Sequence, residues 1–226
     1  MENFIIGKGV LTKYTGEETS VTIPDSVKKI GERAFKFTKV ESVTIPDSVI
    51  AIGSFAFFGC ENLKSITIPD SVTEIGKYAF NGCKKLTSVT IPSSVTKIGI
   101  GVFGECTELT SITILDGVKK IGGCSFHGCT NLKSVEIPDS VTSIGDFAFG
   151  GCTELKSVVI PNSVTFISSD AFYECEKLEK VVIPDNIKKI EWTAFACCSS
   201  LNKIVFRGQT YEKWNKETYS AIKDML

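Results

Sequence analysis

Nine cysteines and a single histidine are the side chains of this 226-residue chain best suited to nucleophilic or metal chemistry. Seven of the cysteines recur at intervals of 23 residues, whereas Cys124 and Cys197 lie outside that series. The members of the series are Cys60, Cys83, Cys106, Cys129, Cys152, Cys175 and Cys198. A buried free cysteine behaves as a small hydrophobic side chain. The regular column therefore predicts thiols that pack inside a repeated fold.

The alternatives for these thiols differ in what they require. Neighbouring members of the column could come within disulfide distance, and a reducing intracellular setting would keep them free. A thiol-dependent sensor or enzyme needs an exposed thiol of lowered pKa beside a basic group. Only Cys124 and Cys197 are candidates for that role. We therefore predict free thiols and place a thiol-dependent function below a non-catalytic one.

His127 is the only histidine, so any metal site or catalytic triad built on imidazole must include it. The spacing Cys124-x-x-His127-x-Cys129 suggests zinc, but Cys129 belongs to the column expected in the core. Aspartates also recur, each after proline or Leu115, where a carboxylate serves a turn. They are Asp25, Asp47, Asp70, Asp116, Asp139 and Asp185. We predict no catalytic residue, metal site or cofactor, and we expect His127 to be a surface turn residue.

A sequence repeat must position all of these residues. The dipeptide Ile-Pro marks the repeat, first after 22 residues and then at a period of 23, and Ile114-Leu115 replaces it once. The dipeptides begin at Ile23, Ile45, Ile68, Ile91, Ile137, Ile160 and Ile183, and a degenerate copy lies at Phe206-Arg207. A fixed period of this length is typical of proteins built from stacked units.

The unit from Leu63 to Cys83 illustrates the expected local structure. Apolar residues alternate with polar ones from Ser65 to Ile68, which predicts a short strand with one buried face. Proline at 69 ends that strand, and Pro-Asp-Ser favours a turn. Val72 and Ile75 should point inward again, and Gly76 should supply a backbone conformation that other residues avoid. We expect Ala79-Phe80 to begin a helical or 3₁₀ turn whose phenylalanine fills the core.

Stacking of these units gives the predicted fold, because a unit of 23 residues cannot bury its apolar face alone. We predict an α/β-repeat, right-handed leucine-rich-repeat solenoid of horseshoe shape. It should have one parallel sheet, helical turns on its convex side and few long helices. One column of phenylalanines should fill its core. These are Phe35, Phe57, Phe80, Phe103, Phe126, Phe149, Phe172 and Phe195.

The repeat resembles the BspA-like leucine-rich repeat over about residues 20 to 207, and the stretch from Ile137 to Val159 carries its motif clearly. The resemblance implies a non-catalytic binding scaffold. Proteins of that family are often bacterial or protozoan surface proteins, and some are adhesins. Residues 1–7 show no signal-peptide pattern, so the localisation stays open between cell surface, secretion and the cytoplasm.

Composition limits the partners of the chain. A formal net charge of -1 gives no overall field that would attract nucleic acid. No stretch approaches the roughly 18 apolar residues of a membrane span. We therefore expect an unknown protein or glycan as partner, no membrane insertion, and a monomer.

The two ends depart from the repeat, although we treat residues 1–226 as a single domain. We expect residues 1–19 to be an N-terminal cap, with a hairpin around Gly7-Lys8-Gly9 that pairs with the first repeat strand. Residues 208–226 should form a cap helix, with Thr210 as its N-cap and Trp214 over the last coil. The helical spacing involves Tyr211, Trp214, Thr218, Ile222 and Met225. The alternative is that Trp214 and Tyr211 bind a ligand.

Two outward-facing columns of the strands provide the candidate binding surface. The first is Ser20, Ser42, Ser65, Ser88, Ser111, Ser134, Ser157, Lys180 and Lys203. The second is Thr22, Thr44, Thr67, Thr90, Thr113, Glu136, Val159, Val182 and Val205. An exposed apolar strip beside charge is a candidate contact surface, so we expect Val159, Val182, Val205, Lys180 and Lys203 to bind a partner through the concave sheet. The alternatives are that the cap helix covers the valines, or that the domain is a structural spacer without a ligand.

Overall fold

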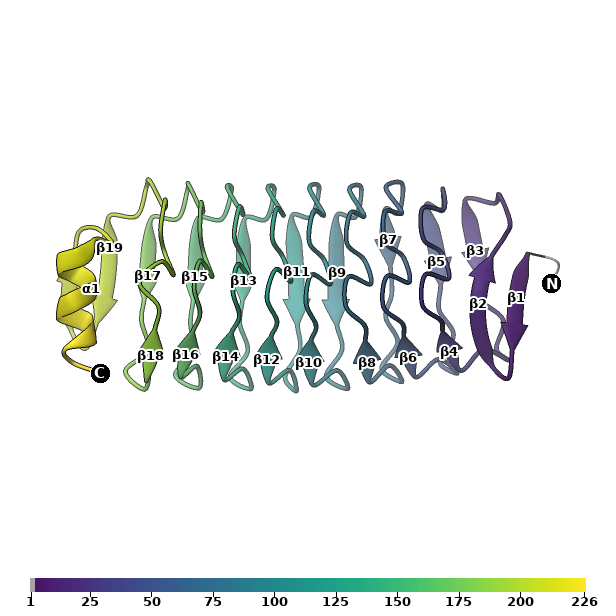
Figure 1. The fold of residues 1–226 in the computed structure, drawn as a ribbon, viewed down its shortest axis with the longest axis horizontal. Helices are drawn as coiled ribbons and strands as arrows, with labels where there is room; N and C mark the ends of the chain where they lie inside the picture. Colours follow the sequence, from purple (N-terminus) through teal and green to yellow (C-terminus); the bar gives the residue numbers. More distant parts are fainter. Residues whose placement is uncertain (1–2) are drawn as a thin grey trace.

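The computed structural model describes residues 3–226 and shows a solenoid whose coils follow one another along a nearly straight axis (Figure 1). Each coil places a strand of two to four residues on what we call the first face. These strands are β3 (Ser20–Thr22), β5 (Ser42–Thr44), β7 (Ser65–Ile66), β9 (Ser88–Ile91), β11 (Ser111–Ile114), β13 (Ser134–Glu136), β15 (Ser157–Val159), β17 (Lys180–Val182) and β19 (Lys203–Phe206). The apolar–polar alternation of each strand buries one side and exposes the other.

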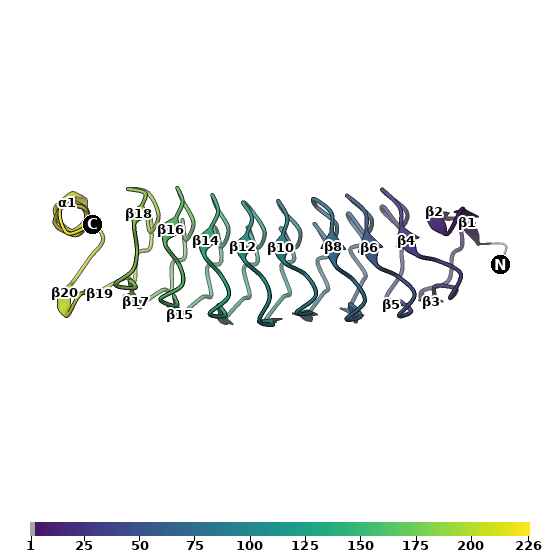
Figure 2. The same ribbon diagram turned by 90° about the horizontal axis from the view of Figure 1, so that it is seen from below.

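A second stack of strands lies on the opposite side of the coils, which we call the second face (Figure 2). These strands are β4 (Lys29–Ile30), β6 (Ala51–Ile52), β8 (Glu74–Ile75), β10 (Lys97–Ile98), β12 (Lys120–Ile121), β14 (Ser143–Ile144), β16 (Phe166–Ile167) and β18 (Lys189–Ile190). The prediction of one sheet was therefore wrong. The segment around Val72 and Ile75 turns inward as expected, but it also pairs with its counterpart in the preceding coil.

On both faces the strands are parallel, and each residue pairs with the residue at the same repeat position in the next coil. Ser111 lies opposite Ser88 on one side and Ser134 on the other, and Ile98 lies opposite Ile121. The pairing is interrupted once on each face, between β7 and β9 and between β8 and β10. Because equal repeats pair in register, every side chain has its own counterpart as its nearest neighbour in the next coil.

The predicted helical turn at Ala79-Phe80 is a series of tight turns in the structure. Each coil holds bulky or glycine residues with positive φ, such as Phe55 at 57° and Gly59 at 68°, and such residues do not continue a right-handed helix. The N–H groups of Phe55, Phe57 and Gly59 donate to carbonyls of the next coil at 2.7–2.9 Å. These bonds between coils take the place of helical ones.

The stack is nearly straight, and the expected horseshoe is not seen (Figures 1 and 2). Ring centroids of neighbouring phenylalanines in the core column lie 4.8–5.8 Å apart. That spacing is close to the roughly 4.8 Å between paired strands. A horseshoe forms when the elements on one side of the coils are wider than the strands on the other side. Here the second face is also made of strands, and the turns are not wider elements either.

The phenylalanine column from Phe35 to Phe195 is buried as predicted, and its rings are stacked within 15° of parallel. The cysteine column runs beside it as free thiols. The Sγ of Cys83 donates to the carbonyl of Phe57 at 3.4 Å, and Cys106 repeats the bond to Phe80 at 3.3 Å. The same carbonyls also accept the N–H groups of Cys60 and Cys83, so each thiol adds a second bond that joins two coils.

Gly76 serves the stack differently from the sequence expectation. Its φ is not positive, but a Cβ at this position would lie 2.4 Å from the backbone nitrogen of Ser54 in the preceding coil. Gly82, by contrast, has a φ of 73°. Close approach of two backbones thus favours glycine at 76, and the left-handed conformation favours it at 82, although Glu105 and Glu174 adopt that conformation in other coils.

At the N-terminal end, β1 (Phe4–Gly7) and β2 (Val10–Tyr14) form an antiparallel hairpin. It was expected to pair with the first repeat strand, but β2 pairs with β4 on the second face. The Tyr14 ring stacks on Phe35 with centroids 5.1 Å apart, so it ends the aromatic column.

At the C-terminal end, β19 forms a hairpin with β20 (Gln209–Tyr211), and helix α1 spans Lys216–Lys223. The helix starts later than predicted, because the N-cap is Asn215 and not Thr210. The segment around Thr210 instead extends the sheet. Trp214 packs against Phe195 with ring centroids 5.1 Å apart and covers the last coil, as expected.

Candidate binding surface

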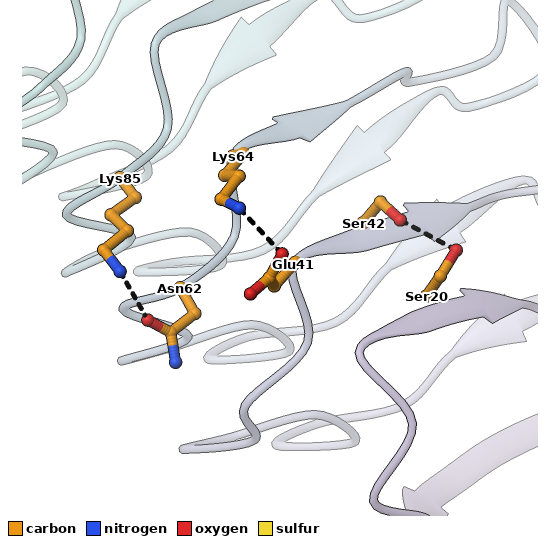
Figure 3. A network of polar contacts seen from close by, with 6 residues as sticks. All are labelled: Ser20, Glu41, Ser42, Asn62, Lys64 and Lys85. Atoms are coloured by element: carbon orange, nitrogen blue, oxygen red, sulfur yellow. Dashed lines mark hydrogen bonds and ion pairs between the residues drawn. The ribbon is translucent and has the colours of Figure 1, made fainter.

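The outward columns of the first face are polar in the N-terminal coils, and some polar side chains on and beside them bond between coils (Figure 3). The hydroxyl of Ser42 donates to that of Ser20 at 2.9 Å. The Lys64 ammonium lies 2.7 Å from the carboxylate of Glu41.

The C-terminal coils carry a different surface, which we call the valine strip: Val159, Val182 and Val205. The three residues are direct neighbours on β15, β17 and β19. Val159 is 70% exposed and Val182 is 41% exposed. Val205 is half-buried, and β20 places Thr210 beside it.

The cap helix does not cover the valine strip. Helix α1 lies toward the second face, whereas β15 and β17 lie on the opposite side of the stack (Figure 2). Its Tyr219 ring packs against Trp192 of the last coils at 5.4 Å, and Trp214, just before the helix, donates to the Trp192 carbonyl at 2.8 Å. The covering alternative was therefore wrong, and the two valines face solvent.

Positive charge borders the valine strip. Lys180 lies opposite Lys203 in the neighbouring outward column, and both are exposed without an ion pair among residues 3–226. Lys180 and Lys203 therefore give the valine strip a cationic border that no acidic side chain among residues 3–226 pairs with.

Six of the nine cysteines are buried. Burial raises the pKa of Cys60 to about 11 and that of Cys129 to about 12. Burial also raises the pKa of Cys124, and the nearby carboxylate of Asp146 adds to the effect. A nucleophilic thiol needs the opposite shift. Cys197 is exposed, but the chain offers it no histidine partner, because the only histidine, His127, lies three coils away.

His127 is a partly exposed turn residue, as expected, with Nε2 3.9 Å from a carboxylate oxygen of Glu105. Among residues 3–226, no three histidine, cysteine or acidic side chains converge on a point that could hold a metal ion.

Sequence reasoning missed a group of aromatic residues at the turns of the first coils. The rings of Phe55 and Tyr78 stack at 5.3 Å, Arg33 lies over Phe55 at 5.4 Å, and Lys36 lies over Phe37 at 4.8 Å. Phe37 is 65% exposed. The sequence signal for this group was Phe37, a phenylalanine outside the core column. It occupies the repeat position that Gly59 holds in the next coil.

This chain belongs to the BspA type leucine-rich repeat family. The family pattern matches residues 5–133 and 119–223, with six copies. No curated protein matches the chain.

Three solved structures illustrate the likeness. The T. pallidum leucine-rich repeat protein TpLRR is 31% identical, with a TM-score of 0.75 over 86% of this chain and 97% of that protein. A leucine-rich repeat protein from Eubacterium ventriosum is 27% identical (TM-score 0.66), over 92% of this chain and 49% of its own. One from Bacteroides ovatus is 29% identical (TM-score 0.59), over 88% and 66%. All three are bacterial leucine-rich repeat proteins.

No helix among residues 3–226 has the length and apolar character needed to cross a membrane.

Proposed function

We propose that the chain is a non-catalytic binding module whose valine strip, together with Lys180 and Lys203, recognises a protein or glycan. The partner's contact surface is apolar at its centre and acidic at its margin. In line with the adhesin-like role that the family implies, recognition uses the outer side of the first face. The module acts as a monomer.

The exposure of Val159 and Val182 is the observation that carries this proposal. When an outward strand position serves only the fold, its residue is polar, as it is in the coils before β13. Burying apolar surface is favourable by about 25 cal/mol of free energy for each Å² removed from water. The exposed valine strip does not contribute this free energy in the unbound chain. The unpaired lysines next to it favour a partner that brings acidic groups.

The test is capture of partners on an array of immobilised proteins and glycans. Three labelled chains are compared: the unaltered chain, Val182→Glu and Thr90→Glu. Thr90 occupies the same outward column on β9, so it receives the same new charge on a similar strand. We expect at least one partner that the unaltered chain and Thr90→Glu capture equally and that Val182→Glu loses by at least tenfold.

Two outcomes would overturn the proposal. If Val182→Glu and Thr90→Glu capture every partner equally, the contact lies elsewhere on the molecule. If the unaltered chain captures nothing, the domain is a structural spacer, the alternative that the repeat scaffold also allows.

A further inference from the structure

Each of the two strand stacks has two ends, and these four ends differ in whether another element covers the last strand. At the C-terminal end β20 pairs with β19, and the side chains of α1 and Trp214 lie beside the coil of β18. At the N-terminal end β2 pairs with β4. Within residues 3–226, β3 has β5 as its only partner strand. One strand edge of the repeat stack is therefore open.

The bonds to the second coil show which backbone groups of β3 are free. Ser42 donates its N–H to the carbonyl of Thr19 at 3.0 Å, and Ile23 donates to the carbonyl of Thr44 at 3.0 Å. In a strand, successive residues direct their N–H and C=O groups to opposite sides. The backbone groups of Ser20 and Thr22 therefore point away from β5, toward the open end.

A hollow of about 180 Å³ adjoins this edge. The overhanging hairpin contributes Phe4 and Tyr14 to its wall, and β3 contributes Val21. Its volume exceeds the roughly 150 Å³ of a protein cavity that holds benzene. The hollow thus has room for one apolar side chain on the inner side of an added strand.

A carboxylate stands at the wall of the hollow. Glu18 occupies the column that holds buried leucines such as Leu63 and Leu86 in later coils. The Tyr14 hydroxyl and the Asn3 amide donate to its two oxygens, each at 2.6 Å. These bonds lower the pKa of Glu18, so the group is charged at neutral pH, and no ion pair within residues 3–226 neutralises it.

We propose that the open edge of β3 binds an extended peptide as an added strand, with an apolar side chain opposite Val21 and a basic side chain beside Glu18. Backbone bonds to Ser20 and Thr22 would supply affinity, and the hollow and the carboxylate would supply selectivity, as in other cases of strand addition.

The test uses a fluorescent peptide of sequence Lys-Thr-Val-Thr-Val-Thr-Lys, acetylated and amidated, and a matched peptide with glutamate in place of both lysines. Lysine at each end allows either strand direction. Anisotropy titrations of the full chain should favour the lysine peptide by about fivefold, the upper range of an exposed ion pair. Glu18→Lys should reverse the preference, whereas the control Glu17→Lys, one residue from the hollow, should retain it.

Amide exchange measured by NMR separates strand addition from charge attraction alone. With the lysine peptide bound, exchange at Ser20 and Thr22 should slow at least tenfold. Three results would overturn the proposal: unchanged exchange at both amides, a preference that ignores Glu18→Lys, or exchange that slows with rising protein concentration without peptide, which would show that a second copy occupies the edge.

Discussion

The interior columns and the outward columns of the first face pass through the same coils but change differently along the chain. The interior phenylalanines are the same from Phe35 to Phe195, whereas the outward column changes from threonine to valine after Glu136. An interior residue meets its own counterpart on both sides, so one side chain fits every coil. An outward residue meets solvent or a partner. The comparison teaches that packing between coils keeps the interior constant, whereas the outer side is free to differ from coil to coil.

Alkaline pH should affect the interior most strongly. The raised pKa values mean that the folded thiols hold protons that unfolded thiols release above about pH 9. This stabilisation is complete below that pH and is lost as the pH rises toward 11 or 12. Each buried thiol contributes about 1.4 kcal/mol per pH unit in that window. Urea titrations should therefore show a steep fall in the free energy of unfolding between pH 9 and 11.

The control for the alkaline transition is a chain with Cys83→Ala and Cys106→Ala. Its free energy of unfolding should fall less steeply, by about 3 kcal/mol per pH unit for the two missing thiols. An equal slope in both chains would show that the thiol column is not the cause.

Removing one ring from the aromatic column should have the next largest effect. Phe103→Ala leaves a cavity between two stacked neighbours and should lower the free energy of unfolding by about 3–5 kcal/mol. Phe37→Ala makes the same change at an exposed position, and its effect should stay within about 0.5 kcal/mol. Similar losses for both variants in denaturant titrations would contradict the distinction between interior and surface.

The two kinds of glycine offer a finer test. Gly76→Ala forces the backbones of two coils apart and should cost about 1–3 kcal/mol. Gly82→Ala adds only the left-handed strain of about 1 kcal/mol, because its Cβ would meet nothing closer than 3.6 Å. Thermal unfolding should place the midpoint of Gly76→Ala a few degrees below that of Gly82→Ala. The reverse order would show that close approach is not what requires glycine at 76.

The smallest effect on stability is expected at the valine strip. Val182→Glu exchanges one exposed side chain for another and should change the free energy of unfolding by less than about 0.5 kcal/mol. A loss above 2 kcal/mol would mean that the valine supports folding, and partner loss in this variant would then say nothing about recognition.

The sequence predicted the parts of the fold that each repeat decides alone. The burial of Phe103 and Cys106 follows from their period, and the strand at Ser65 follows from its alternation. It did not predict the second stack, because two extended residues such as Glu74–Ile75 become a strand only through pairing with a neighbouring coil. The role of Gly76 depends on the distance between coils, which a single repeat does not contain.

The candidate site was predictable in part. The outward position of Val159 and Val182 follows from register, but their exposure depends on where α1 packs. That direction follows from contacts of Trp192 and Tyr219, on elements far apart in the sequence. The open edge of β3 was not predicted. It results from the pairing of the N-terminal hairpin with β4 on the second face, which leaves β3 on the first face without it.

A charge scan along one outward column tests the central claim most directly. Glutamate is placed singly at Thr22, Thr44, Thr67, Thr90, Thr113, Val159, Val182 and Val205, and each variant is measured for unfolding free energy and for binding to a partner captured by the unaltered chain. The account predicts nearly constant stability at all exposed positions and loss of binding at the valine strip alone. Equal loss of binding along the whole column, or loss confined to the threonines, would contradict it.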